Sequence, residues 1–147
     1  SSILKTHKLQ KLFGLFFFKF LEFIPNEITL DKKESVSYEF MSLVIEKFRE
    51  IRLVKKYAKH LNIPINKLEK EVKKHYGKTP LIIINELLII EVKRLLLINK
   101  LSHKEISFAL NFDSQSSYTR FIKAHTNLTP TELKKSLETK NKIIIGR

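Results

Sequence analysis

Two stretches of the chain carry polar side chains on what would be one exposed face of a helix. In residues 65–76 the apolar spacing leaves outward the side chains Asn66, Glu69, Lys70 and Lys73. In residues 114–126 the same spacing leaves outward Gln115, Ser116, Thr119 and Arg120. Arginine, glutamine and asparagine can form paired hydrogen bonds with the flat edges of nucleic-acid bases, glutamate can accept one from cytosine, and threonine can meet a thymine methyl group. Taken singly, a stretch of this kind is more often a solvated helix face than a surface that reads DNA.

These two stretches belong to a unit that occurs twice. The run KKHYGKTP at 73–80 recurs 50 positions later as KAHTNLTP at 123–130, and LNI at 61–63 recurs as LNF at 110–112. The one-position difference falls in a turn, where an insertion is tolerated best. We therefore expect helices over 53–61 and 65–76 in the first copy, and over 102–110 and 114–126 in the second. A short helix, a tight turn and a longer helix make a helix-turn-helix.

The turn and cap positions carry residue types that suit such a unit. Asn62 and Asn111 stand where the chain must reverse with a positive φ, which asparagine tolerates better than most residues. Gly77 and Asn127 are expected to end the longer helices. The inward side chains of the longer helices should be Leu68, Val72 and Tyr76 in the first copy, and Tyr118, Phe121 and Ile122 in the second.

Helix starts and close packing are also visible in the sequence. Ser102 and Glu105 have the spacing of a capping box, and Asp113 or Ser114 can cap the helix that follows. Small residues occupy matching places in the two shorter helices, where the longer helix must cross closely: Ala58 and Ser107.

The remaining segments suggest how the units are connected. Residues 81–99 contain no glycine or proline and should form one linking helix about 28 Å long, since an α-helix rises 1.5 Å per residue. Two recognition helices so linked could lie about one DNA turn apart, near 34 Å. Residues 35–51 read as an amphipathic helix and 9–24 as a separate Phe-rich one, with a boundary at 25–33, whereas 139–147 show no helical periodicity. The apolar stripe of the 35–51 helix comprises Phe40, Val44, Ile45 and Phe48.

Composition favours an all-α protein that binds a polyanion. The 147 residues contain only 3 glycines and 4 prolines, and 28 Lys and Arg against 15 Asp and Glu give a formal net charge of +13. Such a charge attracts nucleic acid or anionic lipid over long range. The lysines around the two units are expected to contact phosphates, which position a protein without specifying sequence: Lys55, Lys56, Lys59, Lys73, Lys74, Lys78, Lys104 and Lys123.

Other classes of function find less support in the residues. The absence of cysteine excludes disulfides, thiolate metal clusters and a cysteine nucleophile, and suits a reducing cytoplasm. No pair of histidines has metal-ligand spacing and no phosphate-binding loop or nucleophile motif is visible, so we expect no metal, no cofactor and no enzyme. Charged residues interrupt the apolar runs at 12–24 and 81–98, which argues against a signal peptide and a membrane span. The alternative function is a basic helical module that docks on an anionic membrane or a protein.

Together these residues resemble the AraC/XylS family of bacterial transcription regulators. The resemblance runs from about residue 40 to 135 and is carried by the strings YAKHLNI at 57–63, KKHYGKTP at 73–80, EVKRLL at 91–96, EISFALNF at 105–112 and RFIKAHTNLTP at 120–130. It implies an all-α fold of two helix-turn-helix subdomains joined by a long linker helix and preceded by one or two extra helices. It also implies sequence-specific promoter binding, with base contacts from the outward residues Asn66, Glu69, Lys70, Gln115, Ser116, Thr119 and Arg120.

The resemblance further implies a domain plan and partners. Residues 34–138 would form the DNA-binding domain and 139–147 a tail, while 1–33 would be the helical end of an upstream sensor or dimerising region. Double-stranded promoter DNA, RNA polymerase and a second copy of the chain are then the expected partners, in the cytoplasm and away from membranes. The family prefers glycine where Asn111 and Asn127 stand and an apolar residue where Glu71 stands. A buried carboxylate at that position would be costly, so we expect the second unit to read DNA more strongly than the first.

Overall fold

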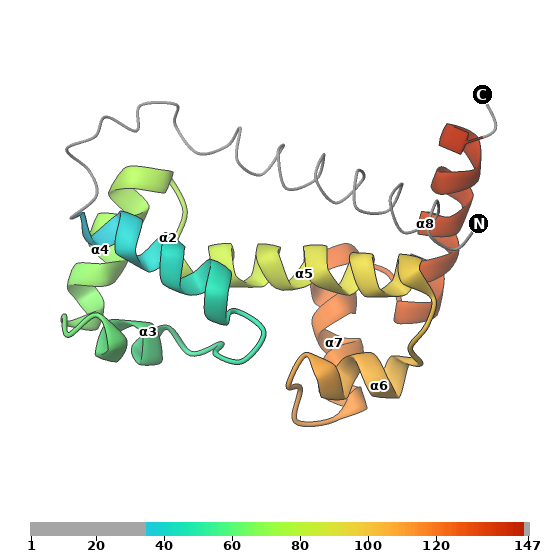
Figure 1. Ribbon diagram of the computed structural model, residues 1–147, viewed down its shortest axis with the longest axis horizontal. Coiled ribbons are helices and arrows are strands. Elements are labelled where there is room, and N and C mark those ends of the chain that lie inside the picture. The colour runs from blue at the N-terminus through green and yellow to red at the C-terminus, as the bar shows by residue number, and fades with distance from the viewer. Residues whose placement is uncertain (1–34, 146–147) are drawn as a thin grey trace. The chain divides into compact units, whose positions relative to one another are not determined.

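The computed structural model describes residues 35–145, and every regular element within them is an α-helix (Figure 1). In chain order the helices are α2 (Val36–Lys47), α3 (Val54–His60), α4 (Ile65–Tyr76), α5 (Pro80–Ile98), α6 (His103–Ala109), α7 (Gln115–Thr126) and α8 (Pro130–Ile145). The predicted all-α fold is confirmed. The helix expected at 9–24 and the boundary at 25–33 lie outside the described residues.

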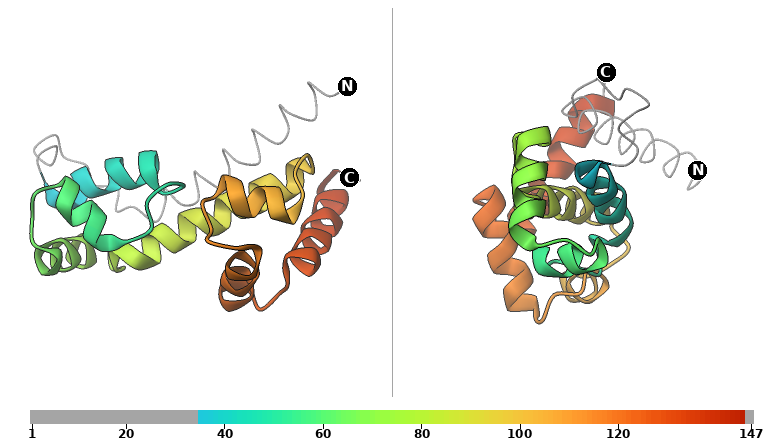
Figure 2. Two further views of the ribbon diagram at one scale, coloured as in Figure 1. Left: turned by 90° about the horizontal axis from the view of Figure 1, so that it is seen from below. Right: turned by 90° about the vertical axis from the view of Figure 1, so that its left-hand side faces the viewer.

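The described chain divides into two compact units within α5. The first unit comprises α2, α3, α4 and residues 80–88, and the second comprises residues 89–98 with α6, α7 and α8. In each unit the longer helix of the helix-turn-helix stands steeply against the shorter one, as α4 does against α3 and α7 against α6 (Figures 1 and 2). A steep crossing leaves one face of the longer helix uncovered by its partner.

The core of the first unit forms where α2 packs on the helix-turn-helix. The fully buried side chains that these three helices contribute are Phe40, Val44, Tyr57, Leu68 and Val72. The ring of Phe40 meets that of Tyr57 edge to face, with centroids 5.6 Å apart. The Tyr57 hydroxyl donates to the Ile51 carbonyl at 2.7 Å, and that of Tyr76 donates to the Ser37 carbonyl at 3.1 Å. Helix α2 is therefore an integral part of this unit.

The second unit builds its core in the same way from α6, α7 and α8. The buried side chains here include Ile106, Leu110, Tyr118, Ile122 and Leu133. The ring of Phe112, in the turn, lies edge to face against that of Tyr118 at 5.4 Å between centroids. As predicted, small residues allow the close crossing in both units, because Ala58 and Ser107 are each 3% exposed.

The turns of the two helix-turn-helix units have the same backbone conformation and the same backbone hydrogen bond. Asn62 has φ 52° and Asn111 has φ 56°, which confirms the predicted left-handed positions. One residue later, the N–H of Ile63 donates to the Ala58 carbonyl at 3.1 Å, and that of Phe112 donates to the Ser107 carbonyl at 3.0 Å. The internal repeat in the sequence is thus a repeat in structure.

Most predicted helix ends are also confirmed. Gly77 and Asn127 end α4 and α7 with φ 70° and 59°. Ser102 and Glu105 form the predicted capping box of α6. Of the two candidates for the cap of α7, Ser114 is the one used: its side chain accepts from the Ser117 N–H at 3.1 Å.

Two predicted helix boundaries were wrong. The helix expected over 35–51 ends at Lys47. The segment 139–147, which shows no clear apolar period, is helical as far as Ile145 as the continuation of α8. Thr129 and Glu132 start α8 with a reciprocal cap, in which the Thr129 N–H donates to the Glu132 carboxylate at 2.7 Å. No glycine or proline follows Pro130 within α8, so the helix continues although its apolar residues lose their regular spacing.

The left-handed turn residue Asn62 makes a testable prediction. Because a side chain with a β-carbon costs about 1 kcal/mol or more in this conformation unless it is asparagine or aspartate, Asn62→Ala should lower the free energy of unfolding by about 1 kcal/mol. Asn62→Gly should change it by only a few tenths, since glycine adopts positive φ without a steric penalty. Urea unfolding of both variants followed by circular dichroism measures the difference. Equal stability of the two variants would contradict a conformational role for Asn62.

Candidate nucleic-acid interface

Helix α4 presents a polar face opposite its buried apolar stripe. Leu68 and Val72 are fully buried, and Tyr76 is half-buried, as predicted. The side chains expected outward are all exposed: Asn66, Glu69, Lys70 and Lys73. The Oδ1 atom of Asn66 accepts a hydrogen bond from the Lys67 N–H at 2.9 Å. That contact occupies one of the two groups that asparagine would need for paired bonding to adenine.

Helix α7 also has a polar face opposite a buried apolar stripe, but the polar side chains on it are different. Tyr118 and Ile122 are fully buried. Phe121 is half-buried, with its ring 5.4 Å from that of Phe112 and 4.3 Å from that of His125, between centroids. Of the side chains expected outward, Thr119 is half-exposed and the others are exposed: Gln115, Ser116 and Arg120. Contact of these residues with bases remains a prediction.

A row of hydrogen bonds along α7 orders the side chain of Arg120. The Ser114 and Ser117 hydroxyl oxygens are 3.0 Å apart, and the Arg120 guanidinium donates to the Ser117 hydroxyl at 3.4 Å. Ser117 was not among the predicted site residues. Its spacing of three residues from both Ser114 and Arg120 is the signal that could have identified it, since such residues are neighbours on a helix surface.

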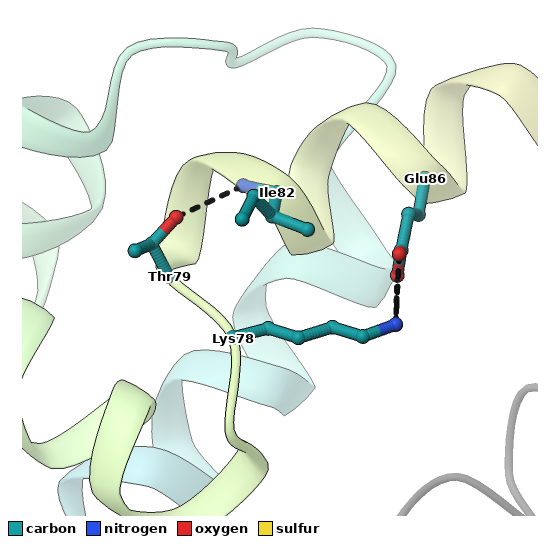
Figure 3. Close-up of polar contacts among 4 residues, drawn as sticks. All are labelled: Lys78, Thr79, Ile82 and Glu86. Atoms are coloured by element: carbon teal, nitrogen blue, oxygen red, sulfur yellow. Dashed lines mark hydrogen bonds and ion pairs between the residues drawn. The ribbon is translucent and has the colours of Figure 1, made fainter. Parts of the chain in front are cut away.

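Seven of the eight lysines that are expected to contact phosphates are exposed: Lys55, Lys56, Lys59, Lys73, Lys74, Lys104 and Lys123. Lys78 differs. Its ammonium group donates to both carboxylate oxygens of Glu86, at 2.7 and 2.8 Å (Figure 3). In the same view the Thr79 hydroxyl caps α5 by accepting from the Ile82 N–H at 3.4 Å. Lys78 is therefore held by a counter-ion at the start of α5.

The departure at Glu71 has a structural answer. Glu71 is half-exposed on α4, so its carboxylate is not sealed within the apolar core. The desolvation penalty of a fully buried carboxylate is avoided at this position. The asparagines that stand where the family prefers glycine, Asn111 and Asn127, both adopt positive φ.

His103 connects the three helices of the second unit. It is the first residue of α6, and its Nδ1 lies 3.4 Å from the Tyr118 hydroxyl of α7 while its Nε2 lies 3.4 Å from the Thr131 hydroxyl of α8. Burial, with a smaller contribution from the positive charge of Lys134, lowers the pKa of His103. Burial also raises the pKa of Tyr118 to about 12. The neutral forms of both side chains therefore suit this contact.

The lowered pKa of His103 predicts acid sensitivity of the second unit. A folded-state pKa below the unfolded value means that protonation favours the unfolded chain, so the stabilisation is complete above about pH 6.5 and is lost as the pH falls below that value. Urea midpoints measured from pH 8 to pH 5 should decline at the acid end in the parent protein and decline less in His103→Gln. Parallel declines in the two proteins would remove His103 as the cause.

The described residues also bear on metal binding and on membrane insertion. Within 35–145 no group of three or more His, Cys, Asp and Glu side chains is arranged to hold a metal ion. None of the helices in this same part of the chain is long and apolar enough to cross a membrane.

Comparison with known proteins places these units in a family. A sequence model of the helix-turn-helix domain family, of the AraC type, matches residues 57–136, which is more than half of the chain. The fold is similar to that in a crystal structure of a DNA-binding transcriptional dual regulator from Escherichia coli K-12, with a TM-score of 0.59 and 14% sequence identity over 73% of this chain and 96% of that chain. Among curated protein sequences, none gives a significant match to this chain. The family match, which covers both helix-turn-helix units, shows that this chain belongs to the AraC/XylS family of DNA-binding transcription regulators.

Proposed function

We propose that the protein regulates transcription by binding a specific asymmetric DNA sequence, with α4 and α7 each reading a major groove in successive turns of the duplex. The observation that carries this proposal is the repeated unit itself. In both copies a helix with a buried apolar stripe, Leu68 with Val72 in α4 and Tyr118 with Ile122 in α7, presents polar side chains to solvent on its other face. A helix-turn-helix binds DNA by placing such a face in the major groove.

The proposed base contacts follow from the chemistry of each exposed group. Arg120 would bond bidentately to guanine, Gln115 to adenine, and Thr119 would meet a thymine methyl group. Glu69 would accept from the amino group of cytosine. The remaining proposed base contacts are Asn66, Lys70 and Ser116.

The proposed phosphate contacts surround these helices. Lysine ammonium groups on flexible stems bind phosphates as point charges, which suits positioning rather than base discrimination. The net charge of +13 supports such a role. We assign phosphate contacts to Lys55, Lys56, Lys59, Lys73, Lys74, Lys78, Lys104 and Lys123. Lys78 must exchange its Glu86 partner for a phosphate.

Selection of bound sequences from a random duplex pool tests this function. It should be done at near-physiological salt with competitor DNA, because non-specific binding weakens as salt rises. The expected result is an asymmetric motif of two boxes whose centres lie about 10 base pairs apart, one helical turn. Binding without enrichment of any motif would overturn the proposal and favour the alternative of a basic module that docks on anionic membranes or on a protein.

The protein partners form a second part of the proposal. Promoter binding would bring the chain to RNA polymerase in the cytoplasm, and the region before residue 34 would join two copies of the chain. Sedimentation of the full chain measures the second point. A concentration-dependent dimer is expected, and a monomer at all concentrations would contradict dimerisation by this region.

A further inference from the structure

We propose that the two units divide the work of binding: the first supplies most of the attraction to phosphates and the second supplies most of the base selectivity. This inference rests on the proposed function and refines it. It is based on positions that the internal repeat makes equivalent. Several of these positions carry a charged side chain in the first unit and a neutral hydrogen-bonding side chain in the second.

The two helices of the first helix-turn-helix present many more cations than anions. Helix α3 exposes three lysines and has no acidic residue: Lys55, Lys56 and Lys59. Helix α4 has one exposed and one half-exposed glutamate. It exposes four more lysines: Lys67, Lys70, Lys73 and Lys74. Within residues 35–145 none of these seven ammonium groups forms an ion pair. All seven are therefore available to replace counterions on a phosphate backbone.

The second unit presents far fewer cations at the equivalent places. On α6 the single lysine, Lys104, is followed directly by Glu105, whose carboxylate is exposed. Where Lys59 stands in α3, α6 carries Phe108, which is 88% exposed. An exposed phenyl ring adds no attraction to phosphates. On α7 only Arg120 and Lys123 carry a full positive charge.

In place of charge, α7 presents neutral donors and acceptors. Four exposed or half-exposed residues in its first two turns bear amide or hydroxyl groups: Gln115, Ser116, Ser117 and Thr119. The equivalent residues of α4 are Ile65, Asn66, Lys67 and Glu69. Base edges are read by hydrogen bonds of defined direction, which amides and hydroxyls provide and an ammonium point charge does not.

The local structure also orders the readout side chains of α7 better than those of α4. Ser114 caps α7 and, through Ser117, connects to Arg120 by contacts of 3.0 and 3.4 Å. Helix α4 starts after Pro64 without a side-chain cap. The Oδ1 atom of Asn66 already accepts a hydrogen bond from the backbone N–H of Lys67. Groups ordered before binding lose less entropy on binding, so an interaction of the same geometry contributes more at α7.

The charge half of the inference is tested by the salt dependence of affinity. The triple variant Lys55→Gln, Lys56→Gln, Lys59→Gln should lower the slope of log K against log salt by about 2 to 2.7, since each phosphate contact contributes about 0.9. It should weaken the selected duplex and a random duplex equally. The corresponding variant in the second unit, Lys104→Gln with Lys123→Gln, removes both lysines of α6 and α7 and should lower the slope by about 1.8 at most. A double variant that lowers the slope as much as the triple would overturn the inference.

The selectivity half is tested with two pairs of proposed base contacts, one pair on α7 and one on α4. Gln115→Ala with Thr119→Ala should reduce the ratio of specific to random affinity by about tenfold or more, with the salt slope unchanged. Asn66→Ala with Glu69→Ala should reduce that ratio by about threefold or less. Equal or reversed losses would overturn the inference. Circular dichroism melts confirm that each variant remains folded, as expected for positions outside the core.

The outcome of duplex selection separates this inference from the function on which it rests. Enrichment of no motif would refute the proposed function. Two boxes of equal sequence conservation among the selected duplexes would leave the proposed function standing and refute the division alone. One strongly conserved box beside a weak one, with the strong box lost in the Gln115→Ala, Thr119→Ala variant, is the expected result.

Discussion

Arg120→Ala is expected to weaken binding to the selected duplex by about 1 to 3 kcal/mol, roughly 5- to 150-fold, and to relax the preference at one base pair. Arg120 is exposed on α7, and its guanidinium is steered by the Ser117 hydroxyl at 3.4 Å. A paired bond to guanine has no substitute once the side chain is removed. Competition binding against every single-base variant of the selected duplex locates the affected position.

Lys123→Ala provides the control for this prediction. Lys123 is exposed one turn further along the same helix and is assigned to a phosphate. Its removal should weaken all duplexes by a similar factor and lower the salt slope by about 0.9. If Arg120→Ala also weakened selected and random duplexes equally, Arg120 would be a phosphate contact, and its assignment to a base would be wrong.

Leu68→Ala is expected to lower the free energy of unfolding of the first unit by about 2 to 5 kcal/mol. The side chain is fully buried where α4 packs against α2 and α3, so truncation loses apolar burial and leaves a cavity. The next residue, Glu69, is exposed, and Glu69→Ala should change stability by less than about 0.5 kcal/mol. The contrast between two adjacent residues tests which face of α4 is buried.

The tyrosines allow this unfolding to be followed in one unit. Three of the 4 tyrosines, Tyr38, Tyr57 and Tyr76, lie in the first unit, and the sequence has no tryptophan. Tyrosine fluorescence in urea should therefore report mainly on the first unit, with an earlier midpoint for Leu68→Ala. A comparable truncation in the core of the second unit, Ile122→Ala, should shift the helical circular dichroism signal more than the tyrosine signal. Identical shifts of both signals in both variants would show that the two units unfold as one.

Much of the fold was predictable because the information is local. An asparagine in a left-handed turn and a serine with a glutamate three residues on act through their own backbone, and the positive φ of Asn62 and Asn111 and the cap at Ser102 were found where expected. The repeat strengthened every such prediction, since two copies with the same pattern must satisfy the same packing. The end of the chain was less predictable, because helix propensity without an apolar period extends α8 beyond what the pattern indicates.

The sequence by itself determined the helices, the turns between them, the apolar stripes and the surplus of positive charge. All of these depend on residue types within a few positions of one another. Which polar groups meet was decided by the tertiary structure: Glu86 takes Lys78 as its partner, and His103 of α6 lies between Tyr118 of α7 and Thr131 of α8. The half-exposure of Glu71 and the near-complete exposure of Phe108 depend in the same way on how the helices cross. Crossing geometry arises from packing between residues distant in sequence, so a local pattern does not contain it.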